Sequence, residues 1–284
     1  ITCRDWSSDV CSSDLLHVDM DKKRLANNLR LLDIAKKIKY EYFAYTAYAL
    51  SPLFEPEYLT MLREDLTTAY ADKLEQPIIE RFASPFGPII IGGTGSNWYA
   101  DTAAAVIIDL GGDDFYTNNS GSGSSLYSIF RKDAEGKDLT DKHVSLPLGI
   151  IIEFGGNDTY ESTRPFEIGS GSVGCGVLLD LAGDDIYISR QWGQGSALFG
   201  CGMLIDASGN DTYRGLELCQ GAAIFGLGML IDKTGDDSYE GHLYCQAFAG
   251  PRGVGLLVEG DGNDRYYSKG TKPTNYGDPG VFDA

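Results

Sequence analysis

The sequence predicts a mostly β fold: a parallel β-solenoid, or β-helix, with rungs of about 26–27 residues, preceded by an N-terminal α-helical hairpin. Three observations predict it. A glycine- and aspartate-rich unit repeats through residues 86–268, each unit places a short apolar strand before a tight turn, and the preceding segment has helical periodicity. A fixed period of this length is typical of solenoids, in which each repeat forms one coil of the chain.

The chain divides into segments by composition. Residues 5–15 read DWSSDVCSSDL, which resembles a short-read sequencing adapter translated in frame, so we interpret residues 1–15 as an artefact of a metagenomic fragment. Residues 16–85 are the predicted helical segment, 86–268 the solenoid and 269–284 a C-terminal tail. We expect the natural N-terminus, with any signal peptide, to be missing.

The helical segment carries two runs of apolar residues at helical spacing. The first extends through residues 20–50 and ends at Ser51-Pro52, because the residue before a proline disfavours the helical conformation. The second runs from Pro56 to about Phe82. A short proline-containing link between two helices predicts a helical hairpin, which we expect to pack on the solenoid.

The repeats align on one turn pattern, in which a glycine is followed by Asp or Asn, an invariant Asp and, two positions later, Tyr. Glycine at this turn supplies a positive φ that other residues resist. The turn glycines recur at the repeat period, except for one longer interval from Gly112 to Gly156: Gly112, Gly156, Gly183, Gly209, Gly235 and Gly262. GTGSNWY at 93–99 is a degenerate first copy, and the long interval contains an insertion at about 118–145 that we predict to be a surface loop.

Equivalent residues of successive rungs stack in a solenoid, so the apolar positions form columns. The tyrosine column is expected to be a stack of rings in the structure: Tyr99, Tyr116, Tyr160, Tyr187, Tyr213, Tyr239 and Tyr266. We assign Val177 and Leu179 of the strand to the interior, which places Leu178 and its equivalents on an outer face. An apolar outer stripe requires cover, and we expect the N-terminal helices, a partner or a second copy of the chain to supply it.

Four cysteines remain once residues 1–15 are excluded, and they occupy repeat positions. Cys175 and Cys201 are separated by one repeat period, as are Cys219 and Cys245. This spacing is unlike a C-x-x-C metal or redox motif. We interpret them as small buried residues, with a disulfide between neighbouring rungs as the alternative.

Acidic residues form two complete columns beside each turn. The candidate metal ligands are Asp109, Glu153, Asp180, Asp206, Asp232 and Glu259 in the first column, and Asp114, Asp158, Asp185, Asp211, Asp237 and Asp264 in the second. A third column between them alternates Asp and Asn. Stacked carboxylates about 5 Å apart repel one another and require compensation. Hydrogen bonds from the N–H groups of the same turn are one candidate, and Ca²⁺ held by carboxylates and turn carbonyls is the other.

The turns GGDDFYTN, GGNDTYES and ASGNDTYRG resemble the RTX-type nonapeptide G-G-x-G-x-D-x-U-x of parallel β-rolls. The resemblance covers the turn half of each unit. It implies a calcium-compatible turn, with the second acidic column supplying the side-chain ligands. It does not extend to the whole β-roll, because the period here is much longer than a nonapeptide, and because Asp or Glu replaces the first glycine of the motif and Tyr its apolar residue.

The net charge of −18 argues against a nucleic-acid partner, and no apolar run is long enough to span a bilayer. We therefore predict a non-catalytic, calcium-binding, structural or adhesive repeat protein that is secreted, periplasmic or on the cell surface and contacts a carbohydrate or protein. One alternative is a carbohydrate-active enzyme, a polysaccharide lyase or glycoside hydrolase, with a site near the insertion, Arg190 and Trp192. The other is a metal-free protein-interaction scaffold. No catalytic motif singles out a residue.

Overall fold

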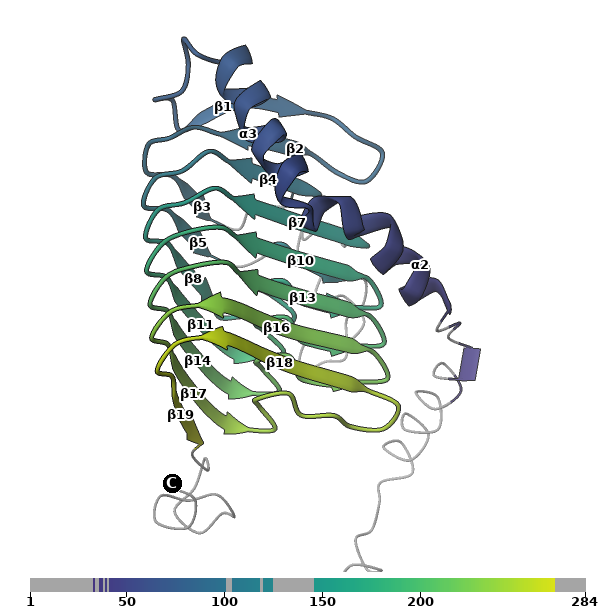
Figure 1. Ribbon diagram of the computed structural model, residues 1–284. Coiled ribbons are helices and arrows are strands. Elements are labelled where there is room, and N and C mark those ends of the chain that lie inside the picture. Colours follow the sequence, from purple (N-terminus) through teal and green to yellow (C-terminus); the bar gives the residue numbers. More distant parts are fainter. Residues whose placement is uncertain are drawn as a thin grey trace, which may run out of the picture. The chain divides into compact units, whose positions relative to one another are not determined.

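A computed structural model describes residues 41–100, 104–117, 120–124 and 146–268, together with Asp33, Lys36, Lys37 and Lys39 (Figure 1). The chain separates into two compact units, residues 1–40 and 41–284, and the fold described below belongs to the second. The predictions for residues 1–15, for most of the insertion and for the tail at 269–284 lie outside the described residues.

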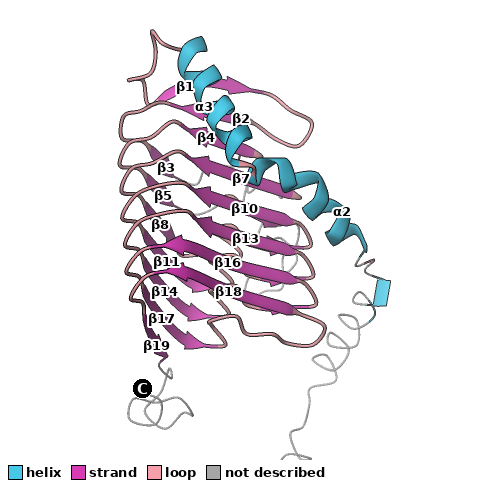
Figure 2. Ribbon diagram, viewed as in Figure 1, coloured by secondary structure: helices cyan, strands magenta, loops and turns pink. Residues whose placement is uncertain are grey.

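The described strands form three sheets (Figure 2). The eight-stranded sheet has, in spatial order, β1 (Ile78–Phe82), β2 (Ile89–Gly92), β4 (Val106–Asp109), β7 (Leu148–Glu153), β10 (Cys175–Asp180), β13 (Cys201–Asp206), β16 (Leu227–Thr234) and β18 (Val254–Asp261). The seven-stranded sheet has β19 (Arg265–Ser268), β17 (Ser238–Leu243), β14 (Thr212–Glu217), β11 (Ile186–Gln191), β8 (Thr159–Ser162), β5 (Phe115–Thr117) and β3 (Trp98–Ala100). The four-stranded sheet has β15 (Ala223–Ile224), β12 (Ala197–Leu198), β9 (Gly171–Ser172) and β6 (Gly123–Ser124).

One rung passes through the three sheets in turn. The rung that begins at Cys175 contributes β10, then the tight turn, then β11, and finally β12 before the next rung begins. Neighbouring strands are parallel and in register, so that Cys175 pairs with Cys201 and Asp180 with Asp206 along β10 and β13. The predicted parallel β-solenoid, in which one repeat of the sequence forms one rung, is therefore confirmed.

Tyrosine and leucine columns fill the interior of the solenoid. The rings of Tyr187 and Tyr213 stack with centroids 4.8 Å apart and planes 3° apart, and both side chains are completely buried. Leu178 and its equivalents pack against this stack in the same core cluster. The assignment of the Leu178 column to the outer face was therefore wrong. An alternation of apolar and polar residues could not show which side chains face the interior. Strands of the eight-stranded sheet such as β10 and β13 are buried on both faces and carry no polar residue before the final Asp.

The opposite face of the wall strands, which includes Val177 and Leu179, belongs to a second apolar cluster. In the described residues, α2 (Glu41–Leu50), the short helix η2 (Ser51–Phe54) and α3 (Pro56–Ala69) run one after the other rather than folding back on each other (Figure 1). Leu59 of α3 is buried in this cluster beside residues of β2 and β7. Helices α2, η2 and α3 thus contribute to the cover of an apolar outer face of the sheet, on the column opposite to the one we had assigned.

The helix expected from Pro56 to about Phe82 ends at Ala69, and β1 occupies Ile78–Phe82. This strand pairs antiparallel with β2, so the sheet begins before the first turn repeat. Pro77 interrupts the helical pattern, and the β-branched pair Ile78-Ile79 favours an extended chain. The insertion also begins later than expected, because Gly123–Ser124 form β6 and pair with β9.

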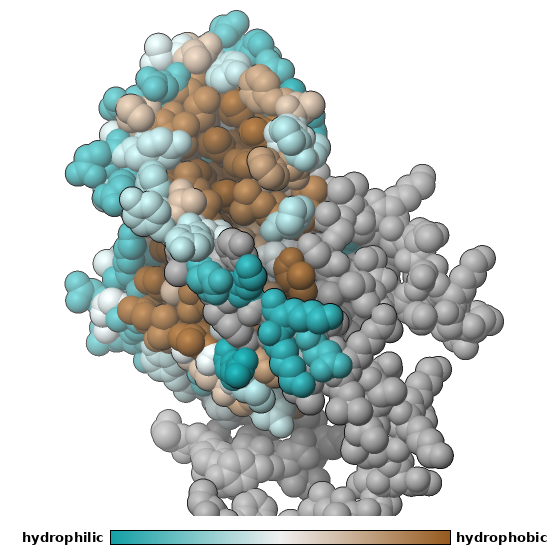
Figure 3. Space-filling model, turned by 90° about the vertical axis from the view of Figure 1, so that its right-hand side faces the viewer, coloured by the Kyte–Doolittle hydropathy of each residue, from teal (hydrophilic) through white to brown (hydrophobic). Residues whose placement is uncertain are grey.

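The cover over this second apolar column does not extend to the last strand. Val254, Leu256 and Val258 of β18 are 39–52% exposed, whereas Met203 and Ile205 of β13 are buried. Figure 3 shows the side of the molecule that lies to the right in Figure 1, and hydrophobic residues gather over much of its upper part. Oligomerisation through an apolar stripe stays a prediction, and the stripe it concerns is the Val177 column rather than the Leu178 column.

The cysteines predicted to be repeat positions are all free thiols, and three of the four are buried. Cys175 and Cys201 occupy the same register position of neighbouring strands. No helix within the described part of the chain is both long enough and apolar enough to cross a membrane.

Candidate metal centre

The two acidic columns arise from opposite sides of the turn in each rung. In the rung of β10 and β11, Asp180 is the last residue of the wall strand and Asp185 immediately precedes the next strand. The tight turn between them folds the chain back, so the two carboxyl groups face each other inside the corner of the solenoid. Both are fully or almost fully buried, at 0% and 1% exposure.

Tyrosine hydroxyls hold the first column. The Tyr160 hydroxyl donates to Oδ2 of Asp180 at 2.7 Å, and the Tyr187 hydroxyl donates to Oδ2 of Asp206 at 2.6 Å, so each ring reaches the carboxylate of the following rung. The other oxygen of Asp206 accepts the N–H of Ser208 from its own turn at 3.1 Å. The tyrosine column, which we had predicted to be only a stack, therefore also orients the first acidic column.

Each second-column carboxylate binds the backbone of the rung before it. Oδ1 of Asp185 accepts the Asp158 N–H at 2.6 Å, and Oδ1 of Asp211 accepts the Asp185 N–H at 2.6 Å. When the neighbouring carboxyl groups are ionised, the remaining oxygen, Oδ2, is buried without a hydrogen-bond donor in five members of the column: Asp114, Asp158, Asp185, Asp211 and Asp237. Buried polar atoms without a partner are rare in native proteins and ask for a specific explanation.

The third column is exposed and bonds in the opposite direction. Oδ1 of Asp113 accepts the N–H of Asn157 from the next rung at 2.9 Å, and Oδ1 of Asn157 accepts the N–H of Asp184 at 2.8 Å. The hydrogen-bond hypothesis expected every Asp to accept N–H groups of its own turn, but only the first column does so. The carboxyl and amide oxygens of the other two columns accept hydrogen bonds from neighbouring rungs and so connect those rungs.

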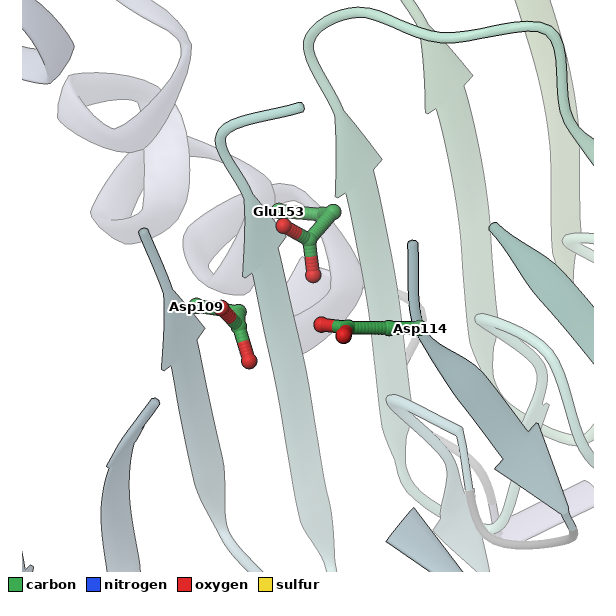
Figure 4. A group of neighbouring side chains, drawn as sticks. All are labelled: Asp109, Asp114 and Glu153. Carbon is green, nitrogen blue, oxygen red and sulfur yellow. The ribbon is translucent and has the colours of Figure 1, made fainter. Parts of the chain in front are cut away.

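All twelve predicted ligands lie in five groups of three, within which one oxygen of each residue lies within 4.8 Å of the others. Figure 4 shows the first group, in which the carboxyl groups of Asp109, Asp114 and Glu153 point toward one another. The five groups are Asp109, Asp114 and Glu153; Asp158, Asp180 and Asp185; Asp185, Asp206 and Asp211; Asp211, Asp232 and Asp237; and Asp237, Glu259 and Asp264. Because Asp185, Asp211 and Asp237 each belong to two groups, the last four groups form one continuous column.

The ion pairs seen in the described residues, such as Arg214 with Glu240, lie away from this column. Removal from water is the main cause that raises the pKa of each buried carboxyl group. The pKa rises from 3.8 to about 9 for Asp114, about 8 for Asp158 and Asp211, about 7 for Asp232 and about 6 for Asp185. The pKa values of Asp180 and Asp206, which are more deeply buried, also lie well above 3.8. The column therefore needs protons or a cation to be neutral.

Asn97 closes the N-terminal end of the column, and the sequence analysis missed it. Its Nδ2 donates to Oδ2 of Asp109 at 2.7 Å, and its backbone N–H donates to Oδ1 of Asp114 at 2.6 Å. The signal was present in the degenerate repeat GTGSNWY, where a neutral amide occupies the position that Asp holds in later rungs. An amide can donate a hydrogen bond where a carboxylate cannot.

Of the features named for the enzyme alternative, the described residues include Arg190 and Trp192. Trp192 is buried and stacks on Phe166, with centroids 5.5 Å apart, so its ring does not line a groove. Arg190 is exposed. Of the histidines, His242 lies in the described residues, where it contacts Glu240 at 3.3 Å. The remainder of the insertion lies outside the described residues.

Replacing Tyr187 with Phe is expected to destabilise the protein by about 1–3 kcal/mol, because buried Asp206 loses its hydroxyl donor while the ring stack remains. Tyr266→Phe is the matched control, since Tyr266 ends the same column and is 47% exposed. Urea unfolding followed by circular dichroism measures both changes. Equal losses in the two variants would show that the hydroxyl of Tyr187 does not stabilise the acidic column.

Comparison with protein-family models, with curated proteins and with solved structures found no match for this chain.

Proposed function

We propose that this chain is a non-catalytic structural or adhesive protein whose buried carboxylate column binds Ca²⁺ between successive rungs. The observation that carries the proposal is the set of five buried Oδ2 atoms without a donor, each grouped with further carboxylates. A bound cation supplies the missing partner for these oxygens. It also neutralises the charge of a column that lies away from the ion pairs of the described residues.

Protons are the competing way to neutralise the column. They suffice at low pH, but the pKa of Asp185 at about 6 and that of Asp232 at about 7 leave negative charge in the interior at neutral pH. Buried carboxylates without a counter-charge are strongly destabilising. The negative charge grows as the pH rises through about 8, the pKa of Asp158 and Asp211, so a cation is needed most above that pH.

The ligand set favours Ca²⁺ among common metal ions. Carboxylate and tyrosine oxygens surround each group, and hard oxygen ligands suit Ca²⁺ and Mg²⁺ rather than zinc or copper. Oxygens on opposite sides of a calcium ion lie about 4.6–5.2 Å apart, twice the usual Ca–O distance. In every group one oxygen of each of the three residues lies within 4.8 Å of the others, so a single ion can contact all three carboxyl groups. Mg²⁺ needs shorter, octahedral coordination and retains water, which suits a closed interior less well.

The resemblance of the turns to RTX nonapeptides supports the same proposal, since it points to the Asp of the second column as the ligand. A calcium-stabilised solenoid also suits a secreted, periplasmic or cell-surface protein, because extracellular calcium modules work with dissociation constants of about 10⁻⁴–10⁻³ M. In that setting the stiffened solenoid would present its outer faces to a carbohydrate or a protein partner.

Terbium luminescence provides a direct test of cation binding, because Tb³⁺ occupies calcium sites and is excited by nearby tyrosines. The Tyr160 and Tyr187 hydroxyls contact first-column carboxylates directly, so we expect sensitised emission that Ca²⁺ displaces and EDTA abolishes. Asp185→Asn is expected to reduce the emission at saturation. The control Asp113→Asn alters the exposed third column and should leave it unchanged.

Calorimetric titration of the metal-free protein with CaCl₂ gives the number of ions. We expect more than one and at most five ions per chain, one for each group. Absence of both binding heat and terbium emission at millimolar metal and pH 8 would refute the proposed function and favour the metal-free scaffold.

A further inference from the structure

We infer that the group Asp211, Asp232 and Asp237 is the highest-affinity cation site of the column and the first to fill. This inference rests on the proposed function and adds to it an order among the sites. The groups differ in how many of their carboxylate oxygens already accept a hydrogen bond. The repeat pattern of the sequence does not show this difference.

When its carboxyl groups are ionised, the fourth group has three buried oxygens without a donor: Oδ2 of Asp211, Oδ2 of Asp237 and Oδ1 of Asp232. All three side chains are at most 2% exposed. The second and third groups have two such oxygens each, and the first has one. An oxygen that accepts no hydrogen bond gives up none when it binds a cation, so the fourth group has the most to gain from occupancy.

The difference arises at Asp232. In the third group, the equivalent oxygen of Asp206 accepts the N–H of Ser208, two residues further along. β16 instead continues past Asp232 to Thr234, which pairs with Asp261 of β18. The backbone after Asp232 therefore stays extended, and Oδ1 of Asp232 is left without a turn N–H.

Position along the column strengthens the inference. The fifth group, next to the fourth, is the one with solvent contact, since Glu259 and Asp264 are partly exposed. At the other end, Asn97 is buried and closes the column with its amide. Among the groups whose three members are all buried, the fourth is therefore the one next to the partly exposed fifth group.

Shared ligands then make the later sites weaker. Asp211 also belongs to the third group and Asp237 to the fifth. Neighbouring rungs lie about 4.8 Å apart, so divalent ions in adjacent groups repel each other. Occupation of the fourth group thus lowers the affinity of the groups on either side, and calcium titrations should show distinct steps.

The test compares Asp232→Asn with Asp180→Asn, the same column position in the second group. An asparagine is compatible with this environment, as Asn97 shows at the end of the column. We expect Asp232→Asn to lower the affinity for the first Ca²⁺ at least about tenfold in calorimetric titration. Asp180→Asn should change that first affinity less than about twofold and weaken a later step. Circular dichroism confirms that both variants fold.

Crystals of the wild-type protein grown with one equivalent of Tb³⁺ test the order without a mutation. Anomalous density is expected among Asp211, Asp232 and Asp237, and density first in another group would overturn the inference. Equal effects of the two Asn variants on the first binding step would do the same. If the wild-type protein binds neither Ca²⁺ nor Tb³⁺, the proposed function itself fails.

Discussion

Removal of Ca²⁺ by EDTA at pH 8 is expected to lower the melting temperature of this protein by about 10 °C or more. A ligand at one hundred times its dissociation constant stabilises the native state by about 2.7 kcal/mol per site. Two occupied groups that share no ligand, such as the second and the fourth, would together contribute about 5 kcal/mol. In a chain of this size, each kcal/mol shifts the melting temperature by about 2–4 °C.

The effect of EDTA should depend on pH in a defined direction. In the metal-free protein, burial raises the pKa of these carboxyl groups above the ordinary 3.8 of the unfolded chain, to about 6 for Asp185, about 8 for Asp211 and about 9 for Asp114. Their contribution to stability is therefore fully present below about pH 4, and it is lost as the pH rises through these folded-state values. Metal-free protein should accordingly lose stability between pH 4 and pH 9.

Calcium competes with the protons for the same oxygens, so its stabilising effect should be small near pH 4.5 and largest above pH 8. Thermal melts at pH 4.5, 7 and 8.5, each in CaCl₂, MgCl₂ or EDTA, measure this dependence. MgCl₂ is the control for ionic strength and for divalent charge. A melting temperature at pH 8.5 that is insensitive to EDTA would refute calcium stabilisation. Stability that rises with pH in EDTA would contradict the burial of protonated carboxyl groups.

The sequence predicted the rungs, and that the acidic residues would lie together, because stacking converts a period along the chain into neighbours in space. Asp158 and Asp185 lie 27 residues apart, yet the N–H of one bonds the carboxylate of the other. A residue that recurs at this period therefore lies next to its equivalent on the neighbouring rung. That is why all twelve acidic candidates were found without knowing a single contact.

The sequence failed where the answer depended on which surface is covered. Leu178 and Val177 are both fully buried, one against the tyrosine stack and the other on the face that carries the helices, and no local pattern distinguishes these two kinds of burial. The extra donor-free oxygen of Asp232 was equally hidden, because it depends on where β16 stops being extended rather than on residue type. The sequence shows Asn97 as a departure from the repeat in the first rung. Its role as a hydrogen-bond donor at the end of the acidic column became clear only from the structure.

Replacing Gly156 with Ala is expected to have one of the largest effects among single substitutions in the turns. Gly156 has φ +146°, a conformation that residues with a side chain rarely adopt, and an added Cβ would collide with the carbonyl oxygen of Gly112 in the rung before it. Neither group can move without separating two hydrogen-bonded rungs. We expect a loss of about 4 kcal/mol or more, the range in which single substitutions are exceptional.

The damage should reach the metal column as well as the fold. Separation of these two rungs breaks the bond from the Asp114 N–H to Oδ1 of Asp158, which holds the second-column carboxylates in line. Gly95→Ala is the matched control, because Gly95 holds the same turn position in the first rung, has ordinary backbone angles and has only the Glu75 carbonyl oxygen near its Cβ position, at 3.4 Å. Urea unfolding and calorimetric titration with Ca²⁺ measure the two consequences. We expect Gly156→Ala to be strongly destabilised and to bind fewer ions, while Gly95→Ala behaves like the wild type. Equal stability of the two variants would show that the close stacking of the glycine turns does not hold the rungs together.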